Sequence, residues 1–162
     1  MLFRSDRLPA DLAHGRVDPR AGHDAWQAIL AATRLALTGQ VRAIVTAPLS
    51  KEALHAAGHD YPGHTELLAE LAGGVEVRMM LANDELRVVL VSIHVPLAEA
   101  VRTLNAPAIV RTIEITDRSL RAAGVRAPRI AVAGLNPHAG EAGLFGREEL
   151  DIIAPAIDQA RA

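Results

Sequence analysis

Apolar residues recur along this chain in two patterns, one with helical spacing and one of short unbroken runs. The helical spacing is clearest over 23–38, and Gly39 supplies an end signal there. The expected buried face of that helix consists of Trp26, Ile29, Leu30, Thr33 and Leu37. Similar spacing, with capping residues and stops, predicts further helices over 50–57, 65–72, 97–104, 107–123 and from about 147 onward.

The unbroken apolar runs predict strands over 41–46, 77–82, 86–93 and 129–133. Turn residues 83–85 separate the second run from the third, so we expect these two to pair as an antiparallel hairpin. Strands that alternate with helices indicate an α/β domain with a mostly parallel sheet and one antiparallel hairpin. Residues 1–21 show no periodicity, and we interpret them as an irregular lead-in to a domain over 22–162.

The composition narrows the class of protein. The chain has 162 residues, half of them apolar and only 2% aromatic, so its core is built mainly from aliphatic side chains. A net charge of −2 gives no electrostatic argument for binding to nucleic acid or to an anionic membrane. The absence of cysteine excludes disulfides and thiolate metal sites. Because no apolar run is as long as a membrane span and no signal peptide begins the chain, we expect a soluble, cytoplasmic protein.

A glycine-rich loop over 134–146 is the first candidate site. It follows the predicted strand over 129–133 and contains one imidazole, His138, and one carboxylate, Glu141. Ligands of open α/β sheets bind beyond the carboxyl ends of the strands, where such a loop lies. The alternative is a plain turn whose histidine faces water.

Two histidines directly follow predicted apolar strands, His94 after 86–93 and His138 after 129–133. Because the carboxyl ends of parallel strands gather at one edge of a sheet, we expect these imidazoles to lie close enough to share a divalent metal ion. Two histidines do not complete a metal site, so a third ligand has to come from elsewhere. Alternatively, His94 only orders the turn before Pro96.

A third histidine, His64, stands beside Thr65 at a predicted helix start. The backbone N–H groups, the hydroxyl and the imidazole there are suited to a phosphate or carboxylate, and Lys51 can add a positive charge. The alternatives are that Thr65 is an ordinary N-cap and that Lys51 is solvated.

Several of these stretches together resemble the 4-hydroxythreonine-4-phosphate dehydrogenase, or PdxA, family of vitamin B6 biosynthesis. They occur in the family's order from about residue 22 to the end of the chain. The matching stretches are Ile44-Val-Thr-Ala-Pro-Leu-Ser-Lys51, Tyr61-Pro-Gly-His-Thr-Glu66, Met79-Met-Leu-Ala82 with Leu86-Arg-Val88, His94-Val-Pro-Leu97 and Leu135-Asn-Pro-His-Ala-Gly-Glu141. The resemblance implies an α/β/α fold like that of isocitrate and isopropylmalate dehydrogenases, two domains, and a homodimer.

The resemblance also implies an activity, the NAD-dependent oxidation of a phosphorylated hydroxy acid, 4-phosphohydroxy-L-threonine, followed by decarboxylation. It makes His94 and His138 catalytic ligands of a divalent metal (Zn, Mg or Co), and it makes His64 and Thr65 substrate contacts. It implies no contacts to NAD that we can place on this chain.

The chain departs from the family in length and at one position. The family is about twice as long. Its N-terminal part has no counterpart here, nor has the C-terminal segment with its third metal histidine and its Lys, Asn and Arg substrate contacts, so we expect a fragment. Ala142 stands where the family often has Gly. Two alternatives stay open: a paralogue that acts on a four-carbon phosphosugar acid or an aromatic dihydrodiol, and a non-catalytic remnant that serves as a dimerisation or binding module.

Overall fold

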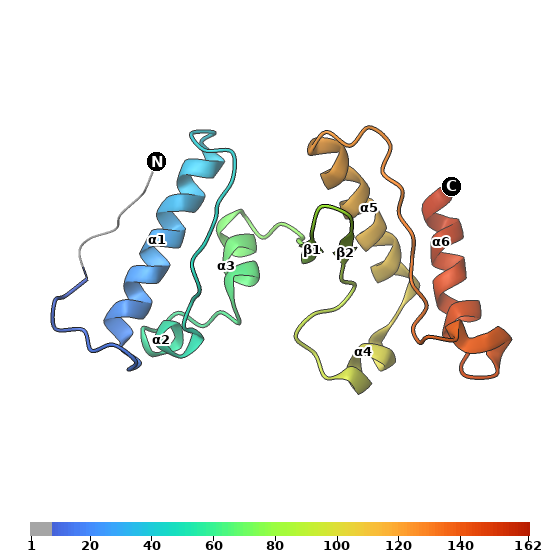
Figure 1. Ribbon diagram of the computed structural model, residues 1–162, viewed down its shortest axis with the longest axis horizontal. Coiled ribbons are helices and arrows are strands. Elements are labelled where there is room, and N and C mark those ends of the chain that lie inside the picture. The colour runs from blue at the N-terminus through green and yellow to red at the C-terminus, as the bar shows by residue number, and fades with distance from the viewer. Residues whose placement is uncertain (1–7) are drawn as a thin grey trace. The chain divides into compact units, whose positions relative to one another are not determined.

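The computed structural model describes residues 8–162, so the first part of the expected lead-in, residues 1–7, lies outside the described residues. The chain divides into two compact units, one ending at Val77 and the other covering Arg78–Ala162. The first is coloured blue to green and the second green to red (Figure 1). Among the described residues, no helix is both long enough and apolar enough to cross a membrane.

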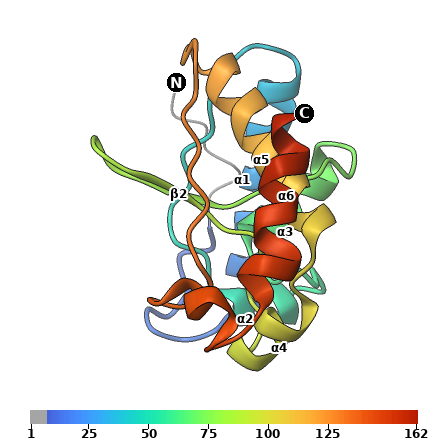
Figure 2. The same ribbon diagram turned by 90° about the vertical axis from the view of Figure 1, so that its right-hand side faces the viewer.

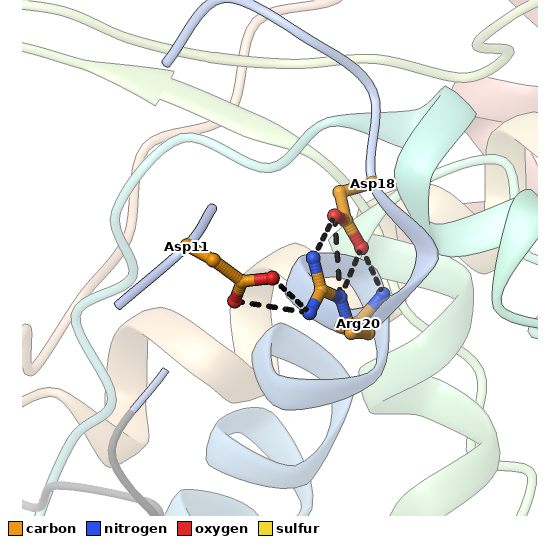
Figure 3. A network of polar contacts seen from close by, with 3 residues as sticks. All are labelled: Asp11, Asp18 and Arg20. Atoms are coloured by element: carbon orange, nitrogen blue, oxygen red, sulfur yellow. Dashed lines mark hydrogen bonds and ion pairs between the residues drawn. The ribbon is translucent and has the colours of Figure 1, made fainter. Parts of the chain in front are cut away.

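The first unit is built on α1 (Pro19–Leu37), which begins four residues before the predicted start. Asp18 is the reason, because its side chain accepts a hydrogen bond from the Arg20 N–H at 2.8 Å and Pro19 occupies the first helical position. The Arg20 guanidinium also bridges Asp18 and Asp11, with nitrogen–oxygen distances of 2.8 and 3.1 Å (Figure 3). This local chemistry fixes the start of α1.

Two short helices pack near α1, namely α2 (Lys51–Ala56) and α3 (His64–Leu71). The side chain of Ser50 caps α2, as predicted, by accepting from the Ala53 N–H at 3.2 Å. The core of this unit contains Ile29 of α1, Leu54 of α2 and Leu67 of α3, and the last two side chains are fully buried. The small unit therefore rests on a few aliphatic contacts between its three helices.

The second unit begins with the predicted hairpin, which the structure confirms. Strand β1 (Met80–Ala82) pairs antiparallel with β2 (Arg87–Val89), and Leu81 lies opposite Val88. The turn forms because the side-chain oxygen of Asn83 accepts from the N–H groups of Glu85 and Leu86 at 2.9 and 2.7 Å. The paired strands are much shorter than the predicted runs.

The two other predicted strands, over 41–46 and 129–133, are wrong for this structure. Both segments are extended but form no sheet, and Val45 is 97% exposed. A strand requires a neighbouring backbone as its hydrogen-bond partner, and neither segment has a ladder partner among the described residues. Within that part of the chain the only sheet is the antiparallel pair β1–β2, so the expected mostly parallel sheet is not formed there.

Helices make up the rest of the second unit: α4 (Leu97–Thr103), α5 (Ala106–Ala122) and α6 (Ala154–Arg161). A short turn segment with left-handed backbone, η1 (Ala139–Gly143), and a π-helical turn, η2 (Glu149–Ile153), precede α6. Figure 2 shows α5 and α6 side by side, where they enclose the core of this unit. The core residues are Ile109, Val110, Ile153 and Ala156.

Candidate active site

The glycine-rich loop contains a run of left-handed backbone directly after His138. Five consecutive residues have positive φ, from 48° at Ala139 through 42° at Glu141 and 55° at Ala142 to 97° at Gly143. Each non-glycine residue in this region costs about 1–2 kcal/mol relative to right-handed backbone. Such backbone persists only where surrounding contacts enforce it, and it is concentrated at functional sites. The strain makes the loop a candidate for function, while the alternative of a plain turn with a solvent-facing histidine stays open.

Contacts within the loop fix the backbone of His138. The side-chain oxygen of Asn136 accepts a hydrogen bond from the His138 N–H at 2.9 Å, and the Asn136 carbonyl accepts from the Ala139 N–H at 3.0 Å. On the far side, the Phe145 N–H donates to the Gly140 carbonyl at 3.0 Å. These bonds close one turn at the histidine and another just after it, and so fix the backbone from which its side chain projects.

The His138 side chain has one charged and one aromatic neighbour. Its Nδ1 lies 3.6 Å from Glu141 Oε2, which is an ionic contact but too long for a hydrogen bond. Its ring centroid lies 5.5 Å from that of Phe145. The side chain is 67% exposed, so its Nε2 edge is accessible to a ligand.

His94 also has left-handed backbone, with φ of 57°. It is exposed, and it follows β2 and the irregular residues 90–93. The strain at His94 accords with a role beyond ordering the turn before Pro96. Within residues 8–162 no group of three or more His, Cys, Asp or Glu side chains is placed to hold a metal ion. The shared metal site of His94 and His138 stays a prediction.

The predicted anion site lies at the start of α3 in the first unit. Helix α3 begins at His64, with Gly63 as N-cap and no side chain capping its first turn. Thr65 is therefore the second helical residue, and the alternative that it is the N-cap is wrong. Lys51 is brought to this point, because its Cε lies 3.8 Å from where a Cβ on Gly63 would be. A helix N-terminus and a lysine thus come together, as an anion site requires, but the Glu66 carboxylate lies at the same point, with its Oε2 3.7 Å from that Cβ position.

Sequence reasoning missed two clusters. In the first unit Trp26 stacks on His59 with ring centroids 4.3 Å apart, and His23 Nδ1 lies 3.0 Å from His59 Nε2. Gln27, one helical turn after His23, contacts the other nitrogen of that ring at 2.8 Å. The second cluster joins Glu149 to the His138 loop. Only the spacing of His23 and Gln27 was a usable signal, since the other partners are distant in sequence.

One antiparallel strand pair and further extended segments, with helices between them, give this chain the element order of an α/β protein (Figure 1). Residues 4–162 match the family model described as pyridoxal phosphate biosynthetic protein PdxA. The chain belongs to the PdxA family.

Two relatives and two solved structures define the likeness. The chain is 58% identical over 161 residues to 4-hydroxythreonine-4-phosphate dehydrogenase of Beijerinckia indica, covering 99% of the chain and 48% of the relative. It is 52% identical over 154 residues to D-threonate 4-phosphate dehydrogenase of Salmonella typhimurium, covering 95% of the chain and 47% of the relative. The relatives are dehydrogenases, so the family is one of oxidoreductases.

The solved structures confirm the fold at the level of the α/β class. A crystal structure of 4-hydroxythreonine-4-phosphate dehydrogenase from Klebsiella pneumoniae has a TM-score of 0.88 at 52% identity, covering 94% of this chain and 46% of that one. A terephthalate 1,2-cis-dihydrodiol dehydrogenase from Burkholderia xenovorans has a TM-score of 0.67 at 33% identity, covering 95% and 50%. The chain spans about half the length of the relatives it matches.

Proposed function

We propose that this chain carries part of the active site of an NAD-dependent, metal-assisted dehydrogenase that oxidises and decarboxylates 4-phosphohydroxy-L-threonine. The observation that carries the proposal is the His138 loop, whose strained backbone and neighbouring Glu141 present an accessible imidazole. The family match and the name of the Beijerinckia indica relative support the reaction class and the substrate.

His94 and His138 are the proposed metal ligands. Both are exposed imidazoles; His94 itself has left-handed backbone, and His138 directly precedes the left-handed run. Neutral imidazole suits Zn, Co and other divalent ions. When bound, the metal supplies Lewis-acid stabilisation of negative charge on the substrate oxygens. The chain's contribution is to supply the two imidazoles, and at His138 the Glu141 carboxylate lies 3.6 Å from Nδ1.

His64, Thr65 and Lys51 are the proposed phosphate contacts. Gly63 has no side chain to cap α3, so the first N–H groups and the positive end of the helix dipole are suited to an anion, and a phosphate there would have to displace the nearby Glu66 carboxylate. Lys51 adds a full positive charge beside Gly63. Binding of the phosphate group there would fix one end of the substrate. The substrate would then be oriented before the reaction, which lowers the entropic part of the barrier.

For the whole protein we propose the remaining features that the resemblance implies. NAD accepts the hydride, with the protein supplying position and electrostatics. Two copies form a homodimer, and the complete fold is a layered α/β/α arrangement with a mostly parallel sheet. The high TM-score to the Klebsiella pneumoniae enzyme supports this last proposal.

A second candidate substrate is D-threonate 4-phosphate, a four-carbon phosphosugar acid. The observation that favours it is the Salmonella typhimurium relative of that name, whose identity to this chain is 52%. An aromatic dihydrodiol has weaker support, because the corresponding structure is only 33% identical. A non-catalytic remnant is the candidate from a different class, and activity measurements separate it from the others.

The experiment measures NADH formation with both phosphorylated substrates and added Zn²⁺, Mg²⁺ or Co²⁺. Two proteins are compared: the protein purified from its own cell, and residues 1–162 alone. A His138→Ala variant of each is measured beside them. We expect the cellular protein to turn over one substrate and its variant to be inactive. Residues 1–162 should bind the metal weakly without turnover, since two imidazoles leave most coordination positions to water. Robust turnover by residues 1–162 would contradict the expectation of a fragment, and inactivity of the cellular protein would favour the remnant.

A further inference from the structure

Glu149 reaches back from η2 to the loop that carries His138. Its Oε1 accepts a hydrogen bond from the Leu135 N–H at 2.8 Å, across 14 positions of sequence. Leu135 lies three residues before His138, at the point where the extended segment 129–133 enters the loop. The bond therefore anchors the entrance of the loop to the following helical segment.

The other oxygen of the same carboxylate faces the exit of the turn. Glu149 Oε2 is buried and has no hydrogen-bond partner among the described residues. It lies 2.6 Å from the position that a Cβ would occupy at Gly140, whose φ is 69°. Only a residue without a side chain allows the carboxylate to sit there. A buried acceptor left without a donor is unfavourable, and native structures retain few such groups without a functional reason.

The two contacts bracket His138, one before it and one after it. The bonds from Asn136 belong to the loop itself, whereas Glu149 comes from outside the loop. Left-handed backbone over 139–143 is intrinsically unfavourable, so an external contact is needed to hold it in place. A metal ligand requires such support, because small displacements of a ligating histidine lower metal affinity.

We propose that Glu149 is a positioning residue that holds the His138 loop in the geometry for metal binding. This inference rests on the proposed role of His138 as a metal ligand. Glu149 acts through its length and its acceptor oxygen: Oε1 holds the Leu135 N–H, and the rest of the carboxyl group fills the space beside Gly140. Its negative charge is not required, so a neutral side chain of the same shape should serve.

The test compares Co²⁺ binding by residues 1–162 and by three variants, followed through the visible absorption of the bound ion. Glu149→Gln keeps the acceptor and the length, Glu149→Asp keeps the charge but is too short, and Glu149→Ala removes both. We expect affinity within about threefold of the unsubstituted chain for Gln, and about tenfold weaker binding with an altered spectrum for Asp and Ala. Asp158→Asn on α6, an exposed residue paired with Arg161, is the charge-matched control and should change nothing.

Amide hydrogen exchange provides a second readout that does not depend on the metal. Exchange at Leu135 and His138 should accelerate about tenfold in the Asp and Ala variants and stay unchanged in Gln and in the control. The proposal would be overturned if Glu149→Ala changed neither the exchange rates nor the Co²⁺ affinity. It would also be overturned if Glu149→Gln weakened Co²⁺ binding as much as Glu149→Ala does. If His138→Ala binds Co²⁺ as well as the unsubstituted chain, the proposed metal role of His138 fails, while accelerated exchange would still establish that Glu149 positions the loop. If Glu149→Ala does not fold, the comparison of Gln with Asp decides.

Discussion

Gly22 of α1 lies against the backbone of Ala53 in α2, so close that a Cβ placed on Gly22 would fall well inside contact distance of the Ala53 carbonyl oxygen. Gly22 is buried in the middle of a helical turn and has no positive φ. Glycine is therefore required at position 22 because two helices approach each other closely there, and not because of the backbone conformation.

Gly22→Ala is expected to destabilise the first unit by about 2–3 kcal/mol, because α1 and α2 have to separate to admit the methyl group. Urea unfolding followed by circular dichroism measures the change. Gly58→Ala is the matched control: nothing lies within 4 Å of its Cβ, and only its positive φ of 84° is unfavourable. That control should cost about 1 kcal/mol. Equal effects at the two positions would show that the helices do not pack as described.

The first unit is expected to lose stability as the pH falls below about 6.5. Burial, with a smaller effect from the charge of His23, lowers the pKa of His59 from its usual 6.5. The unfolded chain therefore binds more protons than the folded chain in this range, and the free energy of unfolding decreases as pH drops through it. Protonation of both rings would also set two N–H groups against each other across the 3.0 Å contact.

Urea unfolding at about pH 7.5 and about pH 5.5 measures this dependence, and His59→Gln should flatten it. The contact of 3.3 Å between His55 and Asp60 is present in both proteins and cancels in the comparison. An equally steep dependence in the variant would assign the effect to other groups.

Ala142→Gly is expected to raise the free energy of unfolding by about 1 kcal/mol, because glycine adopts the φ of 55° without the steric cost that alanine has there. Ala100→Gly in α4 is the opposite case, since right-handed helical backbone favours alanine, and it should lower stability by about 1 kcal/mol. Thermal unfolding of both variants tests the sign. A loss of stability in Ala142→Gly would mean that the left-handed run is absent in solution.

Thr65→Val together with Lys51→Met is expected to weaken the binding of inorganic phosphate by the chain about tenfold or more, since both changes remove a donor near the start of α3. Chemical shifts of the His64, Thr65 and Glu66 amides during a phosphate titration measure the affinity. Thr38→Val is the control, because the Thr38 hydroxyl donates to the Arg34 carbonyl at 2.9 Å at the other end of α1. No shift at the α3 amides in the unsubstituted chain would refute the anion site.

The helices were predictable because their signals are local. The prediction over 107–123 differs from α5 (Ala106–Ala122) by one residue at each end, since Asn105, Pro107 and Gly124 mark it in the sequence. The early start of α1 was missed because the capping role of Asp18 was not recognised. The absence of strands over 41–46 and 129–133 could not be predicted in this way. A strand forms only beside a partner strand, and the apolar content of a segment does not specify that partner.

The candidate site likewise has some features that the local sequence predicts and others that it does not. The glycines around His138 marked the loop, and the helix start near His64 and Thr65 was predicted, whereas anion binding there stays a prediction. The positive φ of Glu141 and Ala142 contradicts ordinary residue preferences, so no local rule would predict it. The contact of Glu149 with Leu135 depends on how the chain returns after the loop, which only the folded structure shows.

The stack of Trp26 on His59 has a spectroscopic consequence. Trp26 and Tyr61 are the only tryptophan and tyrosine of the chain, and both belong to the first unit. Tryptophan fluorescence therefore follows the unfolding of the first unit alone. The stacked imidazole of His59 is expected to quench this fluorescence to a degree that depends on its protonation. The unit from Arg78 onward contributes no tryptophan fluorescence, whereas both units contribute to circular dichroism. Unfolding curves that differ between the two methods would therefore show that the two units unfold in separate transitions.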